Sequence, residues 1–249
     1  GSGKVWEGSM ALAAAFKRAL DEGLPIFDPW YLLRLDEMQL SHILRPKTIS
    51  IPMFRSRLQH LNNLGRVLLD RKMNFQFLLI RHRFSLFSSL YGGYLIDALS
   101  SLDCYRDVVF WNVNGRNHVL RFNKRAYLFA LVYYGRALSS GVNLLLEDPH
   151  NILPITDWRI AQVLRSFGVL VYSKKLAETV DNRIPLKRES DMEIEIRVQT
   201  VNAMTMLLKS INDLLYPMKT VTIIALDNYL YNLSKTLTSE HHLTMTTAY

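Results

Sequence analysis

Apolar residues recur at helical spacing through most of the chain. Within residues 157–168 the apolar positions repeat at i, i+3, i+4 and i+7, and they are Ile160, Val163, Leu164 and Phe167. This pattern predicts an amphipathic helix with one face turned to a core. The same spacing predicts helices over residues 11–23, 36–44, 53–71, 84–99, 124–138, 192–216 and 221–235. A charged loop is expected between them at residues 174–191.

One segment departs from the helical pattern. Residues 108–122 hold runs of β-favouring residues on both sides of Asn114-Gly115, the preferred pair for a type I′ hairpin turn. We therefore expect one small β-hairpin near residues 108–122. The fold class predicted is mainly α, as a single helical domain over residues 1–249.

Composition agrees with an ordinary globular protein. A chain of 249 residues with 49% hydrophobic residues is long enough to bury a substantial core. Its single cysteine, Cys104, excludes an intrachain disulfide and favours a reducing compartment, so a cytoplasmic location is expected. Apolar stretches are too short for a membrane span. Because the chain starts at Gly1 without an initiator Met and soon enters a helix, we interpret it as the remainder of a longer protein.

The formal net charge of +8 suits an anionic partner such as a phosphate. Basic residues are scattered, however, which favours a solvated surface over a nucleic-acid groove. A basic helical module that binds nucleic acid stays open as an alternative. The histidines form no His-x-x-x-His pair with an accompanying acid, so no metal site is predicted.

Carboxylates are the remaining candidates for chemistry. Asp157 lies just before the 160–168 helix, where an Asp is both a favoured cap and a well-held anion. The residues alone leave capping and catalysis open. Asp227 lies in an apolar helical run, where it either meets internal partners or faces a ligand pocket. Arg106-Asp107 and Lys124-Arg125 flank the hairpin, as a local ion-pair network or a phosphate anchor.

Several short blocks, taken in order, resemble the queuosine salvage proteins, which are queuosine-nucleotide N-glycosylases. The blocks are residues 18–26, 105–107, 124–126, 157–173, 193–197 and 226–230. The resemblance implies a mainly α domain similar in architecture to DNA glycosylases. It also implies cleavage of the N-glycosidic bond of queuosine 5′-phosphate, which releases queuine for reinsertion into tRNA. The implied partner is this small nucleotide, with no cofactor, no membrane and no stable nucleic-acid complex.

The resemblance assigns roles to individual residues. Asp157 matches the catalytic acid, and a fixed carboxylate there would stabilise positive charge on the sugar as the C–N bond breaks. The residues expected to bind the substrate are Ile155, Asp227, Asn228 and Asn232 around the base, and Lys124, Arg125 and Arg197 as candidates for the 5′-phosphate.

The chain also departs from the family pattern. Ile155 stands where the family usually has Phe, Asn228 where it has Tyr, and Asn232 where it has Asp. We also expect this chain to lack the family's N-terminal portion, which supplies aromatic and histidine contacts to the pocket. These departures motivate an alternative function: a relative that holds a nucleotide or protein partner without turnover.

Overall fold

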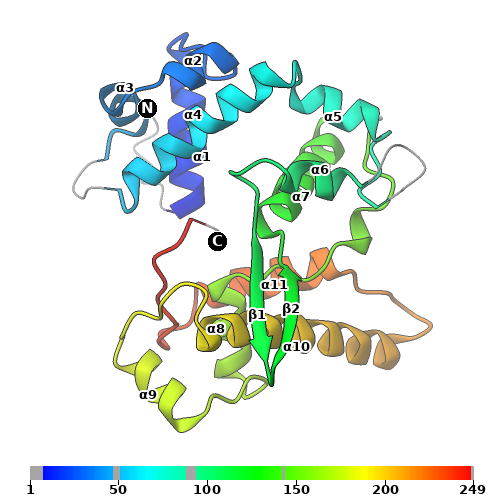
Figure 1. The fold of residues 1–249 in the computed structure, drawn as a ribbon. Helices are drawn as coiled ribbons and strands as arrows, with labels where there is room; N and C mark the ends of the chain where they lie inside the picture. The colour runs from blue at the N-terminus through cyan, green and yellow to red at the C-terminus, as the bar shows by residue number, and fades with distance from the viewer. Residues whose placement is uncertain (1–7, 47–50, 88–93, 142–143, 248–249) are drawn as a thin grey trace. The chain divides into compact units, whose positions relative to one another are not determined.

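The structure is a computed structural model that describes residues 8–46, 51–87, 94–141 and 144–247 (Figure 1). The chain forms two compact units. Unit 1 holds residues 1–78 with 102–104, and unit 2 holds residues 79–101 with 105–249. The prediction of one domain over residues 1–249 stays a prediction, and each unit is taken by itself below.

Unit 1 is a small group of helices: α1 (Gly8–Asp21), α2 (Pro29–Arg34), α3 (Glu37–Leu44) and α4 (Phe54–Asp70). Helix α1 packs on α3, and α2 packs on α4. Gly65 of α4 permits a close approach, because a Cβ at this position would lie 2.5 Å from the backbone of α2. The buried residues at the centre include Ala19, Leu40 and Ile43. Helix α5 (Phe75–Arg81) crosses the boundary between the units.

Unit 2 carries the remaining elements: α6 (Leu95–Ser100), β1 (Val108–Val113), β2 (Arg116–Arg121), α7 (Lys124–Ser140), the 3-10 turn η2 (Pro149–Asn151), α8 (Trp158–Ser166), α9 (Lys174–Asp181), α10 (Asp191–Leu215) and α11 (Ile223–Ser234). Helix α8 packs on both α10 and α11. Its inward face is apolar and almost fully buried, with Ile160, Val163 and Leu164 at 0–1% exposure.

The predicted hairpin is confirmed. Strands β1 and β2 pair antiparallel in a register that runs from Val108 opposite Arg121 to Val113 opposite Arg116. Asn114 and Gly115 have φ values of 52° and 76°, as a type I′ turn requires. Val109 and Phe122 pack on Ile194 of α10. The hairpin thereby brings its two flanking segments, which contain Asp107 and Lys124, to the same end of the ribbon.

The mainly α fold class is confirmed, but two local predictions are wrong. A helix was expected over residues 84–99, whereas α6 occupies only Leu95–Ser100 and residues 88–93 lie outside the described part. The Asp148 carboxylate accepts hydrogen bonds from the backbone N–H groups of Leu86 and Phe87 at 2.6 and 2.9 Å. This holds the segment in a non-helical turn. Phe84 also has a φ of 59°, which a helix does not tolerate.

The second prediction, a charged loop over residues 174–191, is wrong for its first part: helix α9 occupies residues 174–181, whereas residues 182–190 form no helix. Ser173 caps α9 by accepting the N–H of Leu176 at 3.3 Å. Leu176 and Val180 are buried one turn apart, so two apolar contacts and a cap suffice to hold this short helix. The other predicted helices of both units are present, with ends shifted by a few residues.

Candidate active site

Asp157 is the N-cap of α8. Its Oδ1 accepts the backbone N–H of Arg159 at 2.9 Å, so the capping role predicted from the sequence is confirmed. The second oxygen, Oδ2, accepts a hydrogen bond from Lys124 Nζ at 2.6 Å. The carboxylate is therefore held at both oxygens, by a helix N-terminus on one side and by an ammonium group on the other.

Lys124 comes to Asp157 from the first turn of α7, directly after the hairpin. Its side chain is only 5% exposed, and that of Asp157 is 20% exposed. Burial by itself raises the pKa of Asp157, but the Lys124 charge, the hydrogen bonds from Lys124 and Arg159, and the Arg159 charge together bring this pKa below its usual value. The site thus contains a largely buried carboxylate that stays ionised at neutral pH.

A second ion pair lies beside the first. Arg197 Nη2 of α10 donates to Asp107 Oδ2 at 2.6 Å, with both side chains 3% exposed or less. Arg197 also donates from Nε and Nη2 to Thr156 Oγ1, each at 3.3 Å. Glu193 Oε1 is 3.9 Å from its Nη1, and the Phe122 ring centroid lies 3.7 Å from its guanidinium carbon. Of the residues that flank the hairpin, Asp107 forms an ion pair with Arg197 of α10, and Lys124 forms one with Asp157.

Asp227 brings a further carboxyl group to this region from α11. Its Oδ1 is buried and has no hydrogen-bond partner among the described residues. Burial first, and the negative charge of Asp157 second, raise the pKa of Asp227 to about 7, while Lys124 opposes the shift. The two neighbouring carboxyls therefore differ: Asp157 is ionised at neutral pH, whereas the raised pKa of Asp227 extends its protonated form to a much higher pH. Such a division suits an anion and a proton donor in one site.

His241 and His242 lie within electrostatic reach of the Asp157 charge, and the sequence pattern did not predict them as site residues. His242 is buried, and burial, then the neighbouring His241, lower its pKa to about 4, against an opposing effect of Asp157. His241 stacks on Trp158 with ring centroids 3.9 Å apart and an interplanar angle of 24°. The Arg159 guanidinium covers Trp158 at 4.3 Å. Nothing in the local sequence pattern around His241 and His242 predicts a packed segment.

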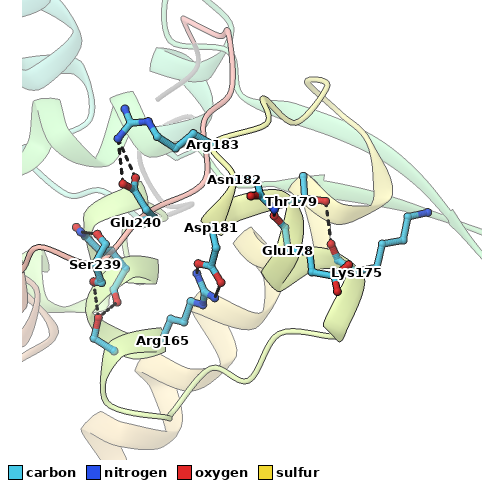
Figure 2. A network of polar contacts seen from close by, with 11 residues as sticks. Arg165, Lys175, Glu178, Thr179, Asp181, Asn182, Arg183, Ser239 and Glu240 are labelled. Carbon is cyan, nitrogen blue, oxygen red and sulfur yellow. Dashed lines mark hydrogen bonds and ion pairs between the residues drawn. The ribbon is translucent and has the colours of Figure 1, made fainter.

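The segment that carries these histidines is tied by polar contacts to α8 and to the residues just after α9 (Figure 2). Arg183 pairs with Glu240 at 2.9 Å, and Ser166 and Ser239 share a hydrogen bond of 2.8 Å. Farther along, the Leu186 N–H donates to the Leu243 carbonyl at 2.7 Å. The last part of unit 2 is thus a docked strap (residues 236–247) that places His241 and His242 beside the cap of α8.

The other sequence-predicted site residues are placed as follows. Ile155 is buried. Asn228 and Asn232 lie on the exposed side of α11, where Asn232 Nδ2 donates to the Asn228 carbonyl at 2.9 Å. Arg125 is half-buried and donates to the Arg106 carbonyl at 3.4 Å. The structure therefore gathers Lys124, Asp157 and Asp227, and Arg197 contacts this group through Thr156. The substrate roles of all these residues stay predictions.

Within ranges 8–46, 51–87, 94–141 and 144–247, His, Cys, Asp and Glu form no group of three or more placed to hold a metal ion. Across the same ranges, no helix combines the length and apolar character needed to cross a membrane.

The whole chain is similar to one family of known proteins. A family model described as queuosine salvage protein matches residues 2–249. The chain belongs to the queuosine salvage protein family. This membership confirms the resemblance drawn from the sequence blocks.

Relatives of this queuosine salvage chain carry the name queuosine 5′-phosphate N-glycosylase/hydrolase. The protein from Sphaerobacter thermophilus is 29% identical, over 80% of this chain and 59% of its own length. The Bos taurus protein is 30% identical over 78% and 55%, and the Schizosaccharomyces pombe protein is 28% identical over 94% and 64%. The chain thus spans between half and two thirds of the length of these relatives.

Proposed function

We propose that the chain hydrolyses the N-glycosidic bond of queuosine 5′-phosphate and releases queuine for use in tRNA modification. The observation that carries this proposal is the Asp157 carboxylate, ionised and held at both oxygens beside the Asp227 carboxyl. The names of the relatives support the substrate and the reaction. The single cysteine, Cys104, supports a reducing, cytoplasmic setting.

In the proposed reaction the bond between the anomeric carbon and the base nitrogen breaks, and its electron pair leaves with the base. The sugar becomes positively charged, and the largely buried Asp157 anion stabilises this charge at close range. Water adds its hydroxyl to the anomeric carbon, and its proton ends on the base. The products are queuine and ribose 5-phosphate.

Asp227 has a complementary part in this proposal. Because queuine is a 7-deazaguanine, it lacks the N7 that assists the departure of ordinary purines. A carboxyl with a pKa of about 7 can donate a hydrogen bond to the leaving base in its neutral form and can accept one in its ionised form. For the 5′-phosphate, Arg125 is the best-placed cation, because it is half-buried whereas Lys124 is committed to Asp157.

The test is turnover by the Asp157→Asn variant. Asparagine is as good an N-cap as aspartate, so the variant keeps the start of α8 while it loses the anion. We expect queuine release, followed by mass spectrometry, to fall by at least about a hundredfold. The matched control is Asp181→Asn, which removes an exposed carboxylate paired with Arg165 in the same unit and is expected to keep full activity. A folded Asp157→Asn protein with wild-type turnover would overturn the proposal.

A further inference from the structure

The Asp107–Arg197 ion pair contacts the chain on both sides of the Lys124–Asp157 pair: at Lys124 itself, and at Thr156 directly before Asp157. On one side, Asp107 Oδ2 accepts the backbone N–H of Lys124 at 3.3 Å. On the other, Arg197 donates twice to the hydroxyl of Thr156, the residue directly before Asp157. One buried pair therefore connects the start of α7 with the loop that delivers the α8 cap.

The contacts of Arg197 fix the orientation of its guanidinium group as well as neutralising its charge. The planar guanidinium of Arg197 engages Asp107 and Thr156 at once, and the Phe122 ring covers one of its faces at 3.7 Å. With a side chain only 3% exposed, it has little surface left for a phosphate. Buried ion pairs add little net stability compared with apolar residues of similar size. What a forked, doubly engaged arginine adds is orientation.

We propose that Asp107 and Arg197 are positioning residues that hold the Lys124 ammonium and the Asp157 carboxylate at their bonding distance. The expected effect on the rate rests on the proposed hydrolysis. The expected effect on the position of Lys124 and Asp157 rests on the contacts alone. It replaces the phosphate-binding role expected of Arg197 with a role that acts through other residues. Neither Asp107 nor Arg197 needs to touch the substrate.

The experiment compares Arg197→Lys, Thr156→Val and Thr156→Ser in the full chain. Lysine keeps the charge but cannot engage Asp107 and Thr156 together, and valine removes the hydroxyl that serine keeps. Because small misplacements of a catalytic group are costly, kcat is expected to fall roughly ten- to hundredfold in Arg197→Lys and Thr156→Val. KM is expected to change by less than about threefold. Thr156→Ser is expected to recover most of the lost kcat.

A second measurement does not depend on turnover. The pKa of Asp157, followed by carbon-13 NMR of its carboxyl, is expected to rise in Arg197→Lys and Thr156→Val as Lys124 is held less closely. The other ionisable groups that influence or adjoin Asp157 are Arg159 on α8, Asp227 on α11, and His241 and His242 on the strap, and all are retained. Arg165→Lys, which alters the forked pair with Asp181, is the matched control and is expected to change neither kcat nor the Asp157 pKa.

Each outcome decides the inference. The inference is overturned if Arg197→Lys and Thr156→Val both keep the wild-type kcat and the wild-type Asp157 pKa. It is also overturned if Thr156→Ser is as slow as Thr156→Val. If circular dichroism shows that Arg197→Lys does not fold, the Thr156 pair decides alone. If the wild-type chain releases no queuine, the proposed hydrolysis fails. The NMR titration then supports the positioning role by a raised Asp157 pKa, or rejects it by an unchanged one.

Discussion

Replacing Lys124 by methionine isolates the contribution of the cation that holds Asp157. Methionine keeps an unbranched side chain of similar length, so the packing around this 5% exposed position is preserved better than by alanine. What is lost is the positive charge and the 2.6 Å hydrogen bond to Asp157 Oδ2. Among the described residues, Asp157 then keeps the hydrogen bond from the Arg159 N–H at 2.9 Å.

The expected loss of stability follows from this geometry. Two unit charges 2.6 Å apart attract by about 6 kcal/mol at an effective dielectric constant of about 20. Desolvation of the ammonium offsets part of this attraction. Removing one partner of a buried pair costs about 3–5 kcal/mol, and the partial exposure of Asp157 places the expected loss near about 3 kcal/mol.

The loss is expected to depend on pH. In the wild type the folded pKa of Asp157 lies below the usual 3.8, so its stabilising effect is complete above pH 3.8 and disappears as the pH falls through the folded pKa. In Lys124→Met, the charge that mainly counteracts the effect of burial is gone, and the Asp157 pKa rises. The difference in unfolding free energy between the two proteins is therefore largest near pH 7 and shrinks below pH 4.

Urea unfolding of Lys124→Met, Asp157→Asn and the double variant forms a cycle that measures the coupling energy. We expect a coupling of about 2–3 kcal/mol, with equal m-values in all four proteins as the check that the same transition is compared. The exposed Lys17–Asp21 pair, 73% and 61% exposed, is the control, with an expected coupling below about 0.5 kcal/mol. A Lys124–Asp157 coupling as small as that of the control would refute the reasoning.

Three further predictions concern other parts of the chain. Gly65→Ala is expected to lower the free energy of unfolding by about 1–3 kcal/mol because its Cβ would clash with α2. Gly135→Ala in α7, which has open space, is expected to raise it by up to about 1 kcal/mol, and equal urea midpoints for the two would contradict the packing described. Because the folded pKa of Asp227 is raised to about 7 from 3.8, wild-type stability is expected to fall as pH rises through this interval. Asp227→Asn is expected to remove that slope, so parallel stability curves from pH 4 to 8 would count against the assignment. Asp148→Ala is expected to cost about 2–3 kcal/mol and to speed amide exchange at residues 86 and 87; unchanged exchange would show that the carboxylate does not hold this turn.

Long helices were predictable because an apolar face persists over several turns. Helices α4, α7, α8, α10 and α11 all follow the 3.6-residue spacing, and the Asn114-Gly115 pair located the hairpin. Short helices such as α2 and α9 carry only one or two turns of pattern, so caps and a few tertiary contacts decide them. The helix expected over residues 84–99 failed for the same reason: the Asp148 carboxylate, distant in sequence, competes for its backbone N–H groups.

The candidate site was predictable only in part. Asp157 and Asp227 stood out because a cap and a carboxylate in an apolar run are both local signals. Lys124 and Arg197 were expected at a phosphate, whereas the observed partners are Asp157 for Lys124, and Asp107 and Thr156 for Arg197. Pairing between residues far apart in the chain has no local signature. The docking of the strap that carries His242 is likewise a tertiary event, without any periodic pattern of its own.

The docked strap determines when, during synthesis, the surroundings of Asp157 can be completed. The hydrogen bond between Arg197 and Asp107 joins residues 90 positions apart, and the strap binds α8 from still later in the chain. Contacts of such sequence separation form slowly, and synthesis proceeds from the N-terminus. A nascent chain on the ribosome can therefore build the hairpin and α7 early, but it leaves Asp157 without its complete surroundings until the strap has emerged.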